Sequence, residues 1–219
     1  GTTPVEGYYS LKTFLKFNKV KNILLSYTPL HLTIQDSFWN RTVKFNFLET
    51  DEYEEIYNKA ILFNNKYILD GDFLDYKIET GLYAIEFLKG ISSLRWKSNR
   101  IISKELLSSQ GHYYFGKNSG NSGLNTESYN KDFVYSILLD NYLQQIIKLA
   151  KENNIKIYWY TMPFNKSSFN KISDRYKISF KNYLTKLESN NFIVLNTINY
   201  RDDKYFGDCY SHLYSGAID

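Results

Sequence analysis

Cysteine, histidine and long apolar runs are scarce in this sequence, and each shortage excludes a class of structure. The only cysteine, Cys209, cannot form a disulfide within the chain, and one Cys and three His offer no spacing typical of a zinc site. No stretch approaches the roughly 20 apolar residues that a membrane-spanning helix needs. Long runs of like charge are absent too, and Lys and Arg are scattered although the net charge is +4. We therefore expect no metal, no bound cofactor and no nucleic-acid partner.

The remaining composition is that of a globular protein with an unusual share of aromatic residues. The 219 residues suffice for one domain with a buried core, and 43% of them are hydrophobic. Aromatic residues make up 18%, and 21 of them are tyrosines. An AT-rich genome would explain this bias, but so would a sugar-binding cleft lined by rings, because Tyr and Trp offer an apolar face with a polar group. Composition does not separate the two explanations.

The opening of the chain predicts a helix followed by a strand. Thr3 is suited to the N-cap, Pro4 to the first helical position, and Glu6 completes a capping box. Residues 21–29, "KNILLSYTP", then form a short apolar run that ends at a proline. Such a run is typical of a buried parallel strand.

The middle of the chain is predicted to be helical. Three stretches within residues 34–110 have helical patterns, and no Pro-, Gly- or Ser-rich linker flanks them. We therefore interpret 34–110 as a helical insertion in a single domain of residues 1–219. Residues 111–128 are rich in Gly, Asn and Ser and predict a loop.

After residue 128 helices and strands alternate. The pattern predicts a long helix over 129–154, a strand over 155–163, a second long helix over 168–191 and a strand over 192–197. The expected core stripe of the first helix is Phe133, Ile137, Tyr142, Ile146 and Leu149. This alternation indicates an α/β fold with a parallel sheet and helices on both faces.

Ligands of open α/β sheets bind beyond the carboxyl ends of the strands. Three segments are expected there: 26–31, 161–165 and 196–212. The last contains the strongest candidate, His212, four residues after Asp208. A histidine oriented by a carboxylate is the recurring general base of acyl transfer. The alternative is that Asp208 caps a turn and His212 only packs.

These residues carry a resemblance to a known family. The stretch "FGDCYSHLYSGA" resembles the final block of the SGNH (GDSL-like) hydrolases, which ends in Asp-x-x-His. The opening, residues 1–32, and "YWYTMPFN", residues 158–165, resemble the branch that modifies bacterial cell-envelope polysaccharides. The resemblance covers the beginning of the chain and roughly its last 90 residues. It does not extend to the helical middle.

The resemblance implies a flavodoxin-like three-layer sandwich that performs acyl transfer or ester hydrolysis on a carbohydrate, such as O-acetylation of an envelope or capsular polysaccharide. It also implies a nucleophilic serine in a Gly-Asp-Ser block, which this chain lacks. Residues 70–75, "DGDFLD", imitate the block, but Phe73 occupies the place of the serine. We expect the serine and its strand to precede Gly1, and this chain by itself to be inactive. A natural pseudoenzyme is the other interpretation.

Other site residues follow from the resemblance one by one. Gly1 would contribute a backbone N–H to the oxyanion hole. The family's third block, Gly-x-Asn-Asp, matches a stretch without its Asn, so Thr28 or Ser26 would have to replace that donor. Asn165 would contact a polar substrate or shape a turn. The Asp–His spacing is one residue longer than in the family, which puts Asp208 in question more than His212, with Asp202 and Asp203 as weaker substitutes.

The resemblance also implies partners: a carbohydrate substrate, an acyl donor and, as a candidate, a membrane-bound acyltransferase, all in the cell envelope. A second functional hypothesis remains open, namely a non-catalytic glycan-binding or assembly module. In that case Trp39, Trp96 and tyrosines would stack against sugars.

Overall fold

The computed structural model describes residues 3–33, 42, 47–69, 88–108 and 120–208. The chain divides into two compact units, the first made of Gly1–Gln35 with Phe115–Asp219 and the second of Asp36–Tyr114. The single domain of residues 1–219 with a helical insertion over 34–110 stays a prediction.

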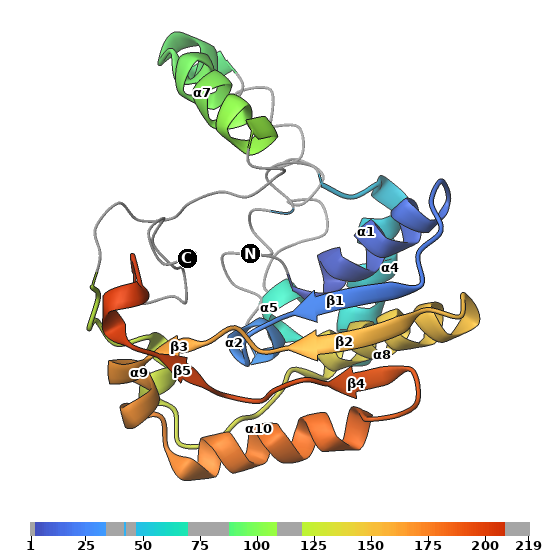
Figure 1. Ribbon diagram of the computed structural model, residues 1–219. Coiled ribbons are helices and arrows are strands. Elements are labelled where there is room, and N and C mark those ends of the chain that lie inside the picture. Colours follow the sequence, from blue (N-terminus) through green and yellow to red (C-terminus); the bar gives the residue numbers. More distant parts are fainter. Residues whose placement is uncertain (1–2, 34–41, 43–46, 70–87, 109–119, 209–219) are drawn as a thin grey trace. The chain divides into compact units, whose positions relative to one another are not determined.

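Three parallel strands form the main sheet of the first unit: β1 (Asn22–Ser26), β2 (Lys156–Tyr160) and β4 (Phe192–Val194). β1 pairs with β2, and β2 pairs with β4, so the order in space follows the order in the chain. Figure 1 shows all three arrowheads pointing the same way. The predicted α/β fold with a parallel sheet is therefore confirmed.

A smaller sheet continues beyond the carboxyl end of β2. It pairs β3 (Phe164–Asn165) with β5 (Tyr200–Arg201), again in parallel. Pro163 lies between β2, which ends at Tyr160, and β3, so its missing N–H falls outside both ladders. In Figure 1 the two small strands lie to the left of the β2 arrowhead, in the direction in which it points.

The helices of the first unit begin where the sequence provides caps. The predicted opening helix is α1 (Pro4–Leu15), with Thr3 as N-cap and Glu6 completing the capping box. Ser173 caps α10 (Asp174–Leu187) by accepting from the Tyr176 N–H. The other helical elements described in this unit are α2 (Leu30–Thr33), η1 (Thr126–Tyr129), α8 (Ile137–Glu152), α9 (Lys166–Lys171) and η2 (Asp203–Tyr205).

The core lies on one face of the main sheet. Alternate strand residues point to opposite faces, and Ile157, Trp159 and Phe192 are buried against apolar side chains of α8 and α10. On the opposite face Asn22 and Lys156, paired in register, are exposed. Within the described residues, helices thus cover one face of the main sheet. The predicted helices on the other face stay a prediction.

Two predicted helices differ in extent from the observed ones. The helix expected over 129–154 begins only at Ile137, and residues 130–136 before it are not helical. Part of its predicted stripe is therefore wrong: Ile137 is exposed, and Phe133 is buried but precedes the helix. The helix expected over 168–191 is divided into α9 and α10, because the Ser173 hydroxyl caps a new start.

The second unit is helical in its described part, as predicted. It contains α4 (Thr50–Leu62), α5 (Lys66–Leu69) and α7 (Arg95–Ser108). Tyr53, Ile56 and Ala60 form the buried side of α4, whereas α7 buries no residue. None of the helices in the described ranges is both long and apolar enough to span a bilayer.

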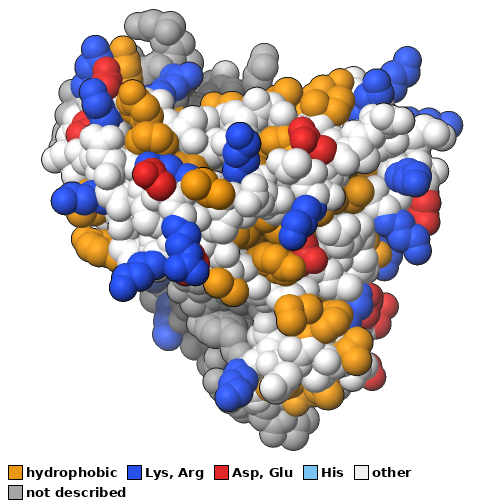
Figure 2. Space-filling view, turned by 90° about the horizontal axis from the view of Figure 1, so that it is seen from below, with side chains coloured by type: hydrophobic (Ala, Val, Ile, Leu, Met, Phe, Trp, Pro, Cys, Tyr) orange, Lys and Arg blue, Asp and Glu red, His pale blue; other side chains and the backbone are white. Residues whose placement is uncertain are grey.

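Charges of both signs are mixed on the surface. In the space-filling view of Figure 2, Lys and Arg alternate with Asp and Glu and with single hydrophobic side chains. That face shows no basic stripe of the kind that nucleic-acid-binding domains present.

Candidate functional site

The carboxyl ends of the three parallel strands bring three polar segments to one edge of the sheet. β1 leads into Tyr27 and Thr28, β2 into Thr161, and β4 into Asn196. In Figure 1, α2, β3 and β5 all lie at this edge. Open α/β sheets bind ligands at this kind of edge, so we describe it as the candidate site.

The turn after β1 is organised by His31. Its Nδ1 accepts from the Thr28 backbone N–H at 3.1 Å and lies 2.9 Å from the Thr28 hydroxyl. A backbone N–H can only donate, so Nδ1 is unprotonated and the neutral ring carries its proton on Nε2. Both side chains are buried, and the His31 ring packs 5.5 Å from that of Tyr27. His31 thus has a definite partner and shapes the turn in which Thr28 lies.

The turns after β2 and β4 are joined by reciprocal hydrogen bonds. The Thr161 N–H donates to Asn196 Oδ1 at 2.6 Å, and Asn196 Nδ2 donates back to the Thr161 carbonyl at 3.2 Å. The fully buried Thr161 hydroxyl also accepts from Trp159 Nε1 at 2.9 Å. The two strand ends are therefore held in a fixed relation by buried polar groups, which is the kind of rigid support that a binding site needs.

The start of α1 also lies at this edge. The Tyr27 hydroxyl, directly after β1, donates to the Thr3 carbonyl at 3.3 Å. The N-terminal end of a helix attracts negative charge, because its first backbone N–H groups have no partner within the helix. Gly1, the predicted oxyanion donor, lies outside the described residues, so its role stays a prediction.

Asn165 has a structural role in the turn after β2. Its Oδ1 accepts from the Ser168 N–H as the N-cap of α9, and its Nδ2 donates to the carbonyls of Asn121 at 2.6 Å and Gly123 at 3.0 Å. The side chain is buried and joins the loop before η1 to β3. Of the two predicted roles, the turn role is observed, and substrate contact stays a prediction.

The acidic residues near the end of the described chain differ in environment. Asp203 accepts from both the N–H and the hydroxyl of Ser167, and Asp202 lies 3.7 Å from Lys166. Both therefore contact the start of α9. Asp208 is half-buried and follows η2 in the chain. The nearby strand β5 pairs with β3, which lies beyond the carboxyl end of β2.

The remaining predicted residues are placed as follows. Ser26 is the half-buried last residue of β1, next to the turn that contains Thr28. His212 lies outside the described residues, as do Trp39 and the 70–75 stretch. Among the described residues, no cluster of three or more His, Cys, Asp or Glu side chains could hold a metal ion.

Glu127 is a buried acid at this edge that sequence analysis missed. Its Oε1 accepts from the Tyr176 hydroxyl at 2.8 Å, while the buried Oε2 has no hydrogen-bond partner among the residues that the structure describes. Burial raises the pKa of Glu127 to about 7, and the Tyr176 hydroxyl and the Leu30 backbone lower it by less. Leu30 belongs to the turn of Thr28 and His31, so this carboxyl group is next to the candidate site.

Nothing in the sequence around Glu127 indicates burial. It stands in a stretch rich in Asn, Ser and Gly, which predicts an exposed loop. The only local structure that the sequence indicates is a cap at Asn125, whose side chain accepts from the Glu127 N–H at 2.9 Å at the start of η1. A cap predicts a short helical turn, but only the packing of α10 places Glu127 inside the protein.

No protein-family model, no curated protein and no solved structure matches this chain.

Proposed function

We propose that this chain is part of an SGNH-type enzyme that transfers an acyl group to, or hydrolyses an ester of, a carbohydrate. The observation that carries the proposal is the gathering of buried polar turns at the carboxyl edge of a parallel sheet. Such an edge is where α/β sheets place their reactive groups. The strand order, with β1, β2 and β4 adjacent in chain order, is compatible with a flavodoxin-like sandwich.

In this proposal each residue has a definite task. A serine from a Gly-Asp-Ser block preceding Gly1 attacks the acyl donor while His212 takes its proton, and the imidazolium gives this proton to the leaving group as its bond to the acyl carbon breaks. Asp208 orients the imidazole and stabilises the imidazolium. Backbone N–H groups at the start of α1 stabilise the oxyanion, with Thr28 or Ser26 as a further donor. Water or a sugar hydroxyl then removes the acyl group from the serine.

The test uses the complete gene product that contains this chain. We expect it to release acetate from an acetylated oligosaccharide and to react with a fluorophosphonate at one serine. Replacing His212→Ala should lower turnover about 1,000-fold or more, because the general base is lost. The matched control His112→Ala should retain turnover. A His212→Ala protein as active as the unmodified one would refute the assignment.

The second candidate function is a glycan-binding or assembly module without catalysis. The observation that favours it is the exposure of aromatic side chains in each unit: Trp96 is 48% exposed, and Tyr200 is 47% exposed, with its ring tilted against Phe169 at 4.7 Å. Such rings can stack against sugars. Binding of an oligosaccharide together with an absent serine label and no ester turnover would favour this function over the enzyme.

A further inference from the structure

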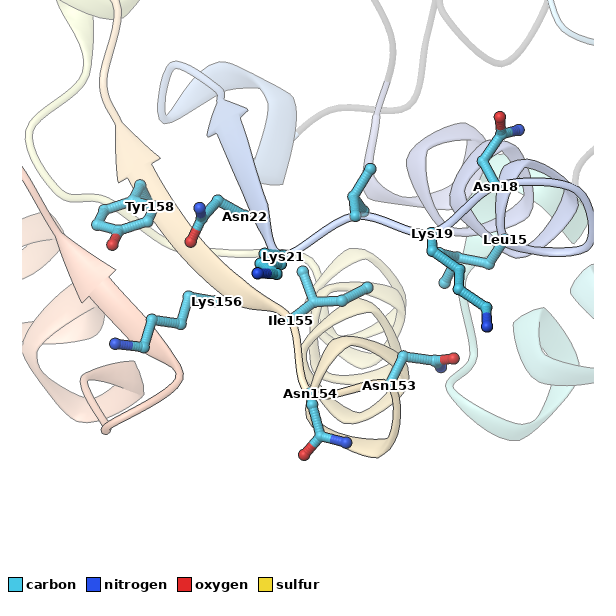
Figure 3. A pocket seen from close by; sticks show the side chains of 11 residues that line it. Leu15, Asn18, Lys19, Lys21, Asn22, Asn153, Asn154, Ile155, Lys156 and Tyr158 are labelled. Carbon is cyan, nitrogen blue, oxygen red and sulfur yellow. The ribbon is translucent and has the colours of Figure 1, made fainter.

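A cavity of about 780 Å³ opens at the amino-terminal edge of the main sheet, opposite the edge of the candidate site. The turn between α1 and β1 and the turn between α8 and β2 form its walls, together with Tyr158 (Figure 3). Its volume is within the range of cavities that bind small ligands. The proposed acyl chemistry makes no use of this cavity.

The charged residues lining the cavity are all basic. Lys19, Lys21 and Lys156 line it, and no Asp or Glu is among the lining residues. All three lysines are exposed, and none forms an ion pair within the described part of the chain. A concave surface with charges of one sign concentrates the electric field and attracts ligands of the opposite sign.

The three ammonium groups are spread out. In Figure 3, Lys156 extends toward the side of Tyr158, Lys19 extends toward the side of Asn153, and Lys21 lies between them. A single small anion has no need of three separated charges, whereas a chain that repeats its negative group along its length can contact all of them. Lysine ammonium groups suit such a ligand, because they act as point charges without a fixed fork geometry.

Amide and aromatic groups complete the cavity. Asn22 and Asn154 line it, and their side chains make no hydrogen bond within the described ranges. Primary amides both donate and accept, as sugar hydroxyls require. Tyr158 is half-buried and lies one strand away from Asn22, on the same face of the sheet, so it offers a ring for the apolar side of a sugar.

We propose that this cavity binds an acidic oligosaccharide. The three lysines contact its negative groups, Asn22 and Asn154 contact its hydroxyls, and Tyr158 stacks on a sugar ring. A nucleic acid is the other elongated polyanion, but it requires a longer basic stripe than the three lysines of this cavity form.

The test measures binding of an oligogalacturonate by titration calorimetry at low salt. Its methyl-esterified form is the neutral control, because it has the same sugar chain without the charge. We expect the acidic form to bind and the neutral form to bind at least tenfold more weakly. The double variant Lys21→Gln/Lys156→Gln should lose about tenfold in affinity, since each exposed ionic contact contributes modestly. The matched control Lys181→Gln/Lys186→Gln removes the same charge from exposed positions on α10 and should bind normally.

Several results would overturn the proposal. These are no binding of the acidic form, equal binding of the neutral form, or equal losses in the two double variants. Inorganic phosphate binding as tightly as the oligogalacturonate would exclude an extended ligand. A single-stranded DNA oligomer that binds more tightly than the oligogalacturonate would identify the cavity as a nucleic-acid site instead. Each of these measurements is independent of ester turnover, so its outcome does not depend on the proposed function.

Discussion

The Glu127 carboxyl group shows how strongly burial changes a single residue. In water a glutamate is ionised at neutral pH, but Glu127 is fully buried, one of its oxygens has no partner within the described part of the chain, and its pKa rises from 4.5 to about 7. The neighbouring Tyr176 has its own pKa raised by burial and by the Glu127 charge. Because the folded protein then holds the proton more tightly than the unfolded chain, this residue makes stability depend on pH.

The sign of this dependence follows from the raised pKa. The contribution of Glu127 to the free energy of unfolding is fully present below pH 4.5 and is lost as the pH rises to about 7. The loss is about 3 kcal/mol of unfolding free energy. We predict that Glu127→Gln, which cannot ionise, unfolds with a similar free energy at pH 5 and a higher one at pH 8. Urea denaturation of both proteins at both pH values checks this, and an unchanged pH dependence in the variant would contradict it.

Helix starts in this protein are determined locally, whereas helix packing depends on distant residues. Thr3 and Glu6 form a capping box that is legible in the sequence. Gly7, one residue later, looks like a weak point of the helix, because glycine is a poor helix former. The structure explains it: a side chain there would collide with the Tyr27 hydroxyl and contact Ile146 Cδ1 at 3.4 Å.

We therefore predict that Gly7→Ala destabilises the protein by about 1 kcal/mol. The gain in helix propensity is outweighed by overpacking between α1, α8 and the Tyr27 ring, which is itself held by the Thr3 carbonyl. The matched control is Gly90→Ala, because Gly90 is also helical but has no atom within 4 Å of an added Cβ. Thermal unfolding should show a lower midpoint for the first variant and an equal or higher one for the second. Equal shifts in both would argue against the close approach.

The whole molecule consists of two units that differ in how much they bury. In the first unit α8 buries six residues, and three of them belong to the core cluster of Trp159, whose ring centre lies 5.9 Å from that of Tyr27 and 6.0 Å from that of Phe192. In the second unit α7 buries none. The free energy of local unfolding rises with the number of buried apolar contacts, so α8 should need more free energy to unfold locally than α7.

Hydrogen exchange can test this difference. We predict that the amides of α8 exchange only with global unfolding, while those of α7 exchange at least 100-fold faster, corresponding to about 3 kcal/mol or more of lost protection. Mass spectrometry of peptides covering Ile137–Glu152 and Arg95–Ser108 measures both in one experiment. Equal protection of the two helices would contradict the prediction.

The elements of this protein were largely predictable from the sequence by itself, because their signals are local. The Thr3–Pro4–Glu6 pattern predicted the start of α1, and the apolar runs that end at Pro29 and Pro163 predicted β1 and β2. Helix ends were harder to predict. Apolar residues at helical spacing lengthened the expected helix back to residue 129, although residues 130–136 are not helical.

Only the tertiary structure decided which polar residues lie together. Thr161 and Asn196 are far apart in the chain, and hydrogen bonds between the Thr161 backbone and the Asn196 side chain pair them. Glu127 lies in a stretch that predicts an exposed loop, yet the packing of Tyr176 buries it. Caps and strand runs depend on neighbours within a few residues, so the sequence determined them. Burial and the pairing of distant groups depend on how elements pack, and that information is spread over the whole chain.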